Sequence, residues 1–292
     1  MPRAKVSTGV ELEYETIGSP ADPALLLVMG FTAQMIQWDL AFCSALADSG
    51  LFVIRFDNRD CGLSTKFDGV AVDSAAVMTA AFSGGEMPPV PYKLSDMAAD
   101  AIGLLDHLGI ERAHIMGASM GGMIVQTMAI EHPTRVRSLV SVMSTVGDPA
   151  YGAAAPEAMG ALLAPPPTTR DEYISASPNW MLWQSKKYQD AERTKALAAI
   201  SFDRSFYPEG STRQLAAILS SGDRSMQLAE VTAPTLVIHG RDDTLITPSG
   251  GLRTAELIPG AHLLFVSDMG HDMPEPLWPL LTDAIISHTR RA

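Results

Sequence analysis

The residues best suited to do chemistry lie in residues 117–121, which read Gly-Ala-Ser-Met-Gly and place Ser119 at the centre of a Gly-x-Ser-x-Gly pattern. A short apolar run precedes this pentapeptide, and a mostly apolar stretch without Gly or Pro follows it over residues 123–130. This order predicts a buried parallel strand, a sharp turn and a helix. The glycines let the backbone reverse quickly, so the serine hydroxyl would project beside the free N–H groups at the start of the helix. Such a serine could attack a carbonyl carbon.

The pentapeptide alone does not establish a nucleophile, because the same pattern arises in glycine-rich loops and serine is an ordinary turn residue. A nucleophilic serine also needs a base within hydrogen-bond reach and a carboxylate that orients the base. The rest of the chain must therefore supply both groups.

His271 is the best candidate for the base among the seven histidines. It follows the last predicted strand, residues 263–266, in a glycine-containing loop, and loops of this kind collect functional residues in parallel-sheet folds. His239 ends the preceding strand and could support the site from behind. The other histidines lie on helices, at helix ends or at strand starts: His107, His114, His132, His262 and His288.

The orienting acid should follow the preceding strand, where residues 240–248 contain Asp242 and Asp243. Asp243 is preferred because the recurrent arrangement is Gly, two residues, then Asp, which leaves Asp242 as a solvated turn carboxylate. Asp148 occupies the alternative position, after the strand at residues 139–143. The chain order Ser119, Asp243, His271 is the order expected for a nucleophile elbow.

Two backbone N–H groups are expected to form an oxyanion hole. Met120 follows the serine, and Phe31 follows Gly30 in the turn after the strand at residues 25–29. Donors of this kind are each worth about 3–4 kcal/mol of transition-state stabilisation.

Short apolar runs alternate with helical segments around these residues. Continuous apolar runs predict buried strands, and residues 10–17 alternate apolar with polar, which predicts an antiparallel hairpin with residues 4–7 at one edge of the sheet. The sequence therefore predicts an α/β fold with a mostly parallel sheet and helices on both faces. Helices are expected at residues 35–48, 74–82, 95–108 and 278–288.

Residues 145–230 differ in character, since they are helical, contain a proline cluster at residues 165–167, and hold aromatic and Met side chains outside strand-like runs. We expect a core domain from residues 1–144 and 231–292, with residues 145–230 inserted as a helical lid. In this lid, Trp180, Met181 and Trp183 either line an apolar substrate pocket or pack the lid helices together.

The composition and charge of the chain limit the kinds of binding partner and compartment that we expect. The chain has 292 residues, 47% of them hydrophobic, and a net charge of -12, which disfavours charge-driven binding to nucleic acid or to an anionic membrane. Cys43 and Cys61 are too few for a disulfide framework and are expected to be reduced. No signal-like or membrane-spanning run is evident, so a cytoplasmic location is expected. The sequence shows no spacing typical of metal ligands, and no cofactor is expected. The sequence does not decide between a monomer and a homodimer.

Together these segments resemble the α/β-hydrolase superfamily across nearly the whole chain, and within it the aclacinomycin methylesterase type, whose corresponding turn also reads Met-Gly. The resemblance implies an eight-stranded sheet, a helical lid and hydrolysis of carboxylic esters. It also implies that Arg59 and Asp60 pin loops under the site. The chain departs from that type at Phe31 and in residues 70–90. The matching segments are residues 26–30, 57–64, 117–122, 239–243 and 270–271.

The leading hypothesis is a serine carboxylesterase that acts on small apolar or aromatic esters through an acyl-enzyme intermediate. Relatives with the same triad cleave C–C bonds of diketones, hydrolyse lactones or amides, or make peracids, and motifs do not separate these activities. Ser119 in place of a carboxylate argues against dehalogenase and epoxide hydrolase chemistry. A non-catalytic small-molecule receptor is a further alternative, which the complete Ser, Asp and His set disfavours.

Overall fold

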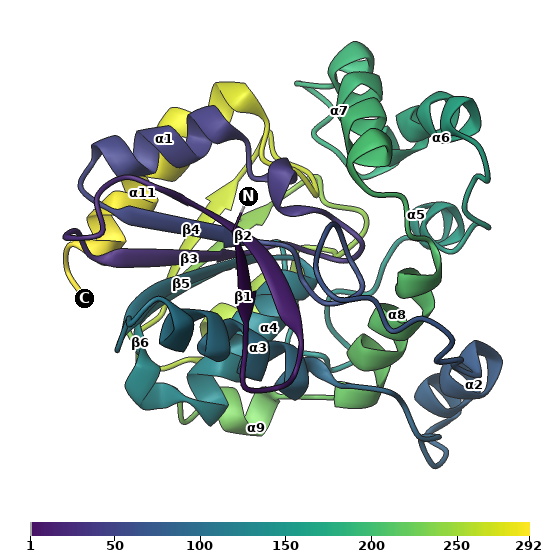
Figure 1. Cartoon of the computed structure of the whole chain (residues 1–292), viewed down its shortest axis with the longest axis horizontal. Helices are drawn as coiled ribbons and strands as arrows, with labels where there is room; N and C mark the ends of the chain where they lie inside the picture. The colour runs from purple at the N-terminus through teal and green to yellow at the C-terminus, as the bar shows by residue number, and fades with distance from the viewer. Residues whose placement is uncertain (1) are drawn as a thin grey trace.

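The protein is built around a single eight-stranded sheet. The structure is a computed structural model that describes residues 2–292. The strand order is β1-β2-β4-β3-β5-β6-β7-β8 (Figure 1). The first hairpin is antiparallel and the strands from β4 onwards in this order are parallel, which confirms the predicted fold class. The bounds are β1 Arg3–Lys5, β2 Glu11–Ile17, β3 Ala24–Val28, β4 Phe52–Phe56, β5 Ala113–Ala118, β6 Val136–Val142, β7 Thr235–Gly240 and β8 His262–Val266.

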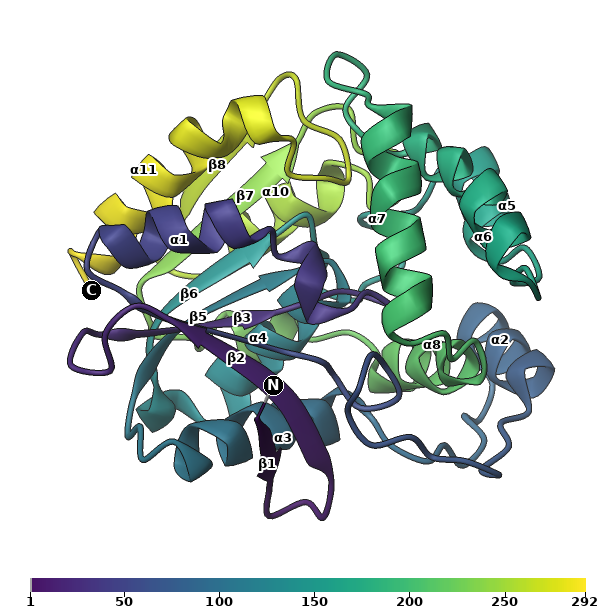
Figure 2. The same cartoon turned by 45° about the horizontal axis from the view of Figure 1, so that its top comes forward.

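Helices cover both faces of the sheet, with α1 and α11 on one face and α3 and α4 on the other (Figure 2). No helix in residues 2–292 is both long and apolar enough to cross a membrane. The bounds are α1 Leu40–Asp48, α2 Ser74–Ser83, α3 Leu94–His107, α4 Met120–Glu131, α5 Pro156–Leu162, α6 Arg170–Ala176, α7 Ala191–Arg204, α8 Glu209–Ser221, α9 Ser225–Leu228, α10 Ser249–Leu257 and α11 Trp278–Thr289. Short 3-10 turns occupy η1 Met35–Gln37, η2 Pro133–Arg135, η3 Ser177–Leu182 and η4 Glu275–Leu277.

One predicted helix is wrong in part. The segment at residues 35–48 divides into η1 and α1. The division occurs because Asp39 caps α1, its carboxylate accepting a hydrogen bond of 2.8 Å from the N–H of Ala41. An N-cap residue has non-helical dihedral angles, so the helix begins afresh after it.

The central strands are buried on both faces because their side chains alternate between two apolar clusters. In β3, Leu26 and Val28 join the cluster under α3 and α4, whereas Leu25 and Leu27 join the one under α1 and α11. All four side chains are fully buried, which stabilises the fold by about 1.5–3 kcal/mol for each. This packing explains the continuous apolar runs in the sequence.

The segment at residues 145–230, which the sequence predicts to be a lid and which keeps that name below, contains helices α5 to α9, and α5, α6 and α7 stand to one side of the sheet (Figure 1). Its α7 and α8 are attached to the core by buried ion pairs. Arg204 lies 2.7 Å from Asp57, and Arg213 lies 2.8 Å from Asp60. Both carboxylates belong to the turn after β4, so the interpretation that Asp60 pins loops together is confirmed. Arg59 similarly pairs with the buried Asp100 of α3, at 2.6 Å.

A second attachment joins the lid to the loop after β8. The N–H of His271 donates to the carbonyl of Trp183 at 2.6 Å, and the N–H of Ser185 donates to Asp272 at 2.8 Å. A β-carbon on Gly270 would lie 2.4 Å from a backbone carbon of the lid, so this close approach needs glycine. These contacts therefore fix the His271 loop against the lid.

Replacing Arg213 by Met should leave the Asp60 carboxylate buried without its cationic partner. We expect the free energy of unfolding to fall by about 3–5 kcal/mol. The control Arg193→Met removes pairs with Asp39 and Glu275 that are exposed, and should cost about 1 kcal/mol or less. Equilibrium urea unfolding measures both values, and equal losses would contradict the buried attachment.

Replacing Asp272 by Asn should change how stability depends on pH. Burial raises the pKa of Asp272 to about 6, although hydrogen bonds from the N–H groups of Ser185 and Gly270 act to lower it. The folded chain therefore holds this proton more tightly than the unfolded chain, and this group costs stability as pH rises from about 4 to about 6. Asp272→Asn keeps the acceptor oxygen but cannot ionise.

The free energy of unfolding of Asp272→Asn, relative to that of the wild type, should thus increase as pH rises through that range. Above that range the difference between the two proteins should stay constant. Asp283→Asn, on an exposed position of α11, controls for the loss of one charge. A difference from the wild type that stays the same between about pH 4 and about pH 7 would overturn the assignment.

Candidate active site

Ser119 lies between β5 and α4 with the dihedral angles φ 58° and ψ −120°. This conformation is strained for a residue with a side chain and costs about 1–3 kcal/mol. Glycine is required on either side of it. A β-carbon on Gly117 would lie 2.0 Å from the carbonyl oxygen of Gly121, and one on Gly121 would lie 2.0 Å from that of Val28. The predicted strand, turn and helix are confirmed, with α4 beginning directly at Met120.

Hydrogen bonds from the end of β6 hold the Ser119 backbone in this conformation. The N–H of Ser119 donates to the carbonyl of Val142 at 2.9 Å, and the Ser144 hydroxyl donates to the carbonyl of Ser119 at 2.8 Å. The Ser119 hydroxyl itself makes no hydrogen bond within residues 2–292, and the residue is partly exposed. It is therefore available to a ligand.

The two backbone donors expected from the sequence belong to Met120, directly after Ser119, and to Phe31, directly after Gly30. A β-carbon on Gly30 would be 3.1 Å from that of Ser119 and 3.6 Å from its hydroxyl, so the turn after β3 borders the serine closely. In the described part of the chain, neither the N–H of Phe31 nor that of Met120 donates a hydrogen bond to another residue. The next N–H, that of Thr32, donates to Gln214 of α8 at 2.8 Å and so fixes this turn.

Asp243 and His271 come together although 28 residues separate them, because β7 and β8 are neighbours in the sheet. His271 Nδ1 donates to Asp243 Oδ2 at 2.7 Å. A carboxylate accepts only, so Nδ1 carries the proton and Nε2 is left as an acceptor. The other oxygen of Asp243 accepts from the N–H groups of Leu245 and Ile246, each at 2.9 Å.

The Asp243 carboxylate is fully buried yet stays ionised. Burial alone would raise its pKa, but the charge and hydrogen-bond interactions with His271 and His239 outweigh burial and leave the pKa below its ordinary value. A charged Asp243 is what His271 needs to keep its proton on Nδ1 and to be stabilised when it becomes an imidazolium.

In the part of the chain that the structure describes, neither alternative acid makes a hydrogen bond to His271. Asp242 is partly exposed and lies 3.7 Å from Arg241, while Asp148 accepts from the N–H of Ala150 in its own turn. Ser119 comes from the same edge of the sheet as the Asp243–His271 pair, since the parallel strands β5, β6, β7 and β8 all end at that edge, β7 and β8 two residues further on. Within residues 2–292, however, no hydrogen bond joins the Ser119 hydroxyl to His271. Proton-transfer contacts are often long without substrate and tighten when it binds.

The lid residues Trp180, Met181 and Trp183 occupy η3 and the residue after it. Trp180 packs edge-on against Tyr173, with ring centroids 5.7 Å apart, in a lid cluster that also includes Phe202 and Phe206. Trp183 contacts the His271 loop through its carbonyl group. Trp180 thus packs within the lid, and Trp183 adjoins the His271 loop.

Sequence reasoning missed Gln214, the α8 residue that holds the turn containing Phe31. Its carboxamide is fully buried and bridges the N–H of Thr32 and, at 2.9 Å, the carbonyl of Arg59. No local pattern marks a single glutamine on an amphipathic helix as such a bridge.

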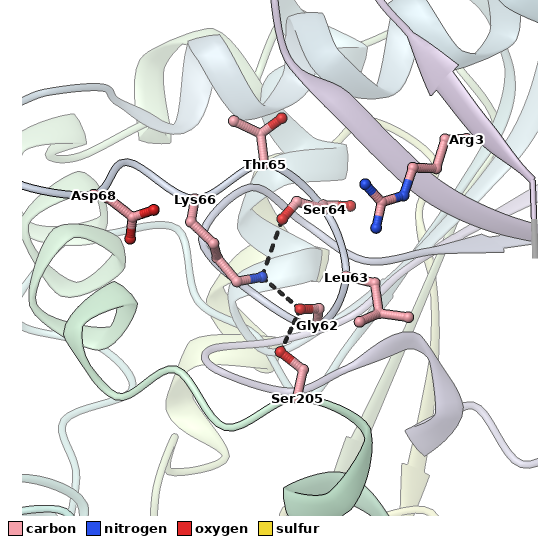
Figure 3. Close-up of a pocket in the computed structure, with 8 residues that line it drawn as sticks. All are labelled: Arg3, Gly62, Leu63, Ser64, Thr65, Lys66, Asp68 and Ser205. Carbon is pink, nitrogen blue, oxygen red and sulfur yellow. Dashed lines mark hydrogen bonds between the residues drawn. The ribbon is translucent and has the colours of Figure 1, made fainter.

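A surface pocket of about 380 Å³ lies beside the turn after β4 and contains none of the residues above (Figure 3). Lys66 and Ser205 enter it, but both donate to the carbonyl of Gly62, and Lys66 also donates to the carbonyl of Ser64 at 3.0 Å. Burial lowers the pKa of Lys66. These polar groups support the turn, so we place the candidate active site at Ser119 and not here.

Known proteins resemble this chain in sequence and fold. It is 28% identical to a rhodomycin D methylesterase of Streptomyces sp. strain C5, over 97% of this chain and 96% of that protein. It is 30% identical to a putative carbamate hydrolase of Variovorax paradoxus, over 89% of each chain. A hydrolase from Pseudomonas aeruginosa has a similar structure, with a TM-score of 0.72 and 26% identity over 98% of this chain and 97% of that chain.

A family comparison agrees with the sheet, the elbow and these relatives. The family model described as alpha/beta hydrolase fold matches residues 23–275, which span β3 to η4 and contain Ser119, Asp243 and His271. The chain is therefore a hydrolase-fold protein that belongs to the α/β hydrolase family.

Proposed function

We propose that this protein is a serine hydrolase that cleaves carboxylic esters of small apolar or aromatic substrates through an acyl-enzyme intermediate. The observation that carries the proposal is the Asp243–His271 hydrogen bond at the sheet edge that also bears the strained Ser119. The names of the similar methylesterase and carbamate hydrolase support it, since each describes hydrolysis at a carboxyl-type carbon.

In the proposed mechanism, Nε2 of His271 removes the proton of the Ser119 hydroxyl while Oγ attacks the ester carbonyl carbon. The oxyanion that forms accepts hydrogen bonds from the N–H groups of Phe31 and Met120. The C–O bond to the alcohol then breaks, and His271 returns the proton to the departing alcohol. A water molecule, deprotonated by His271, attacks the acyl-enzyme, and Ser119 regains its proton as the acid leaves. Asp243 holds the imidazole in the required tautomer.

The position of His271 favours this chemistry over simple binding. Its side chain is 8% exposed, so the imidazole is largely shielded from bulk water. Electrostatic interactions are stronger in such a water-excluded site than in water. The neighbouring lid segment, in which Trp183 adjoins the His271 loop, supports an apolar or aromatic acyl or alcohol group. We therefore assign the lid, residues 145–230, to substrate selection.

Replacing Ser119 by Ala should abolish turnover of short p-nitrophenyl esters, with a loss of about 10⁶-fold in kcat. The wild type should hydrolyse such esters faster than lactones, amides or diketones in the same panel. A fluorophosphonate probe should label the wild type and not Ser119→Ala, with circular dichroism as the check that the variant is folded. Full activity in Ser119→Ala would remove this residue from the mechanism, and an unlabelled, inactive wild type would favour a receptor.

Replacing Asp243 by Asn should lower kcat by about 10⁴-fold, because the imidazole loses the partner that fixes its tautomer. Asp242→Asn and Asp148→Asn are matched controls that also remove one carboxylate, and both should keep kcat close to the wild-type value. Steady-state kinetics on one p-nitrophenyl ester measures all three. If Asp148→Asn were the inactive variant instead, the acid would have to be reassigned.

A further inference from the structure

His239, the penultimate residue of β7, is fully buried behind Asp243. Its Nε2 lies 2.9 Å from the carbonyl oxygen of Ile246. Because a carbonyl oxygen can only accept, Nε2 must carry a proton. The same Nε2 lies 3.4 Å from Asp243 Oδ2, the oxygen that accepts the hydrogen bond from His271. Two imidazole nitrogens, His271 Nδ1 and His239 Nε2, therefore lie 2.7 Å and 3.4 Å from one carboxylate oxygen.

We propose that His239 is a positioning residue, which shares its Nε2–H between Ile246 and Asp243 and so holds the carboxylate in line with His271. This inference rests on the serine hydrolase function proposed above. His239 touches neither substrate nor Ser119, and it acts through Asp243. The turn that contains Asp243 is thereby fixed at three points: the N–H groups of Leu245 and Ile246, and the His239 ring.

The surroundings of the ring leave it little freedom. A β-carbon on Gly251 of α10 would lie 2.3 Å from Nδ1 of His239, so glycine is needed there for the ring to fit. Nδ1 is buried and has no hydrogen-bond partner within residues 2–292. A buried, unpaired N–H is costly, which favours the tautomer with its proton on Nε2. The ring is thus built to donate toward Ile246 and Asp243.

The charge on Asp243 links this contact to the pH dependence of catalysis. The titratable groups that face this carboxylate are His239 from β7, and His271 and Asp272 from the loop after β8. The His239 N–H offsets part of the negative charge on Asp243. Without it, Asp243 attracts the imidazolium form of His271 more strongly, so the base loses its proton only at a higher pH. A residue that merely fills space would not cause this effect.

The test compares His239→Leu, which removes the donor, with His239→Gln, whose amide N–H can occupy the place of Nε2. We expect His239→Leu to lower kcat about tenfold, as for loss of one hydrogen bond to a charged group, with KM nearly unchanged. The acid limb of the kcat/KM profile should move up by about half a pH unit. His239→Gln should recover most of both changes.

His114→Leu is the matched control. His114 is also a buried histidine of the sheet, bonded to Ser138 at 2.8 Å, but it lies at the opposite end of β5 from Ser119. Its variant should lose stability without any movement of the acid limb. Should His239→Leu fail to fold, His239→Asn replaces it, because the shorter amide cannot reach Asp243. Gly251→Ala, which displaces the ring, should shift the limb in the same direction as His239→Leu.

Failure of this inference differs from failure of the proposed function. If a fluorophosphonate does not label Ser119 in the wild type, the function itself is wrong. If labelling occurs but His239→Leu keeps the wild-type kcat and acid limb, the positioning role is overturned. It is equally overturned if His239→Gln and His239→Asn have the same kinetics, since the position of the donor would then not matter.

Discussion

The hydrogen bond from His271 to Asp243 is the interaction on which the candidate site depends. It requires two loops to meet at 2.7 Å, and the parallel pairing of β7 with β8 provides this meeting by ending both strands at one edge. The core then fixes the carboxylate through the N–H groups of Leu245 and Ile246. The lid fixes the histidine loop through the carbonyl of Trp183. The His271–Asp243 pair is thus held by the sheet on one side and by the inserted segment on the other.

The lid has a second role on the other side of Ser119. Buried charges are costly unless they are paired, and the turn after β4 presents Asp57 and Asp60, whose partners Arg204 and Arg213 both come from the lid. These pairs seat α8 so that Gln214 reaches the N–H of Thr32. The turn that carries the Phe31 donor therefore depends on helices that are distant in sequence. One inserted segment supports both the loop of the proposed base, His271, and the proposed oxyanion hole.

Much of this arrangement was predictable from the sequence. The continuous apolar runs predicted the strands because both sides of the central strands are covered by helices, and the helix at residues 74–82 agrees with α2. The glycines around Ser119 predicted the elbow because a β-carbon there would collide with backbone atoms. The choice of Asp243 over Asp242 agrees with the hydrogen bond that His271 makes.

The remainder depends on contacts between distant segments. The break between η1 and α1 comes from Asp39 acting as a cap, and a polar residue inside an apolar pattern can equally face solvent. Gln214 and Arg213 act through partners more than 150 residues away, and no local periodicity specifies a partner at that separation. The roles of the lid tryptophans likewise depend on how η3 packs, because Trp180 packs against Tyr173 within the lid whereas Trp183 contacts the His271 loop.

The central claim is that the hydroxyl of Ser119 becomes covalently bonded to the acyl group of the substrate. The most direct measurement is rapid chemical quenching of the wild-type protein during turnover of a p-nitrophenyl ester, followed by peptide mass spectrometry. The account predicts the mass of one acyl group on the peptide that contains Ser119, formed in step with the burst of p-nitrophenol. Turnover with the acyl group on another residue, or with a burst and no adduct at Ser119, would contradict it.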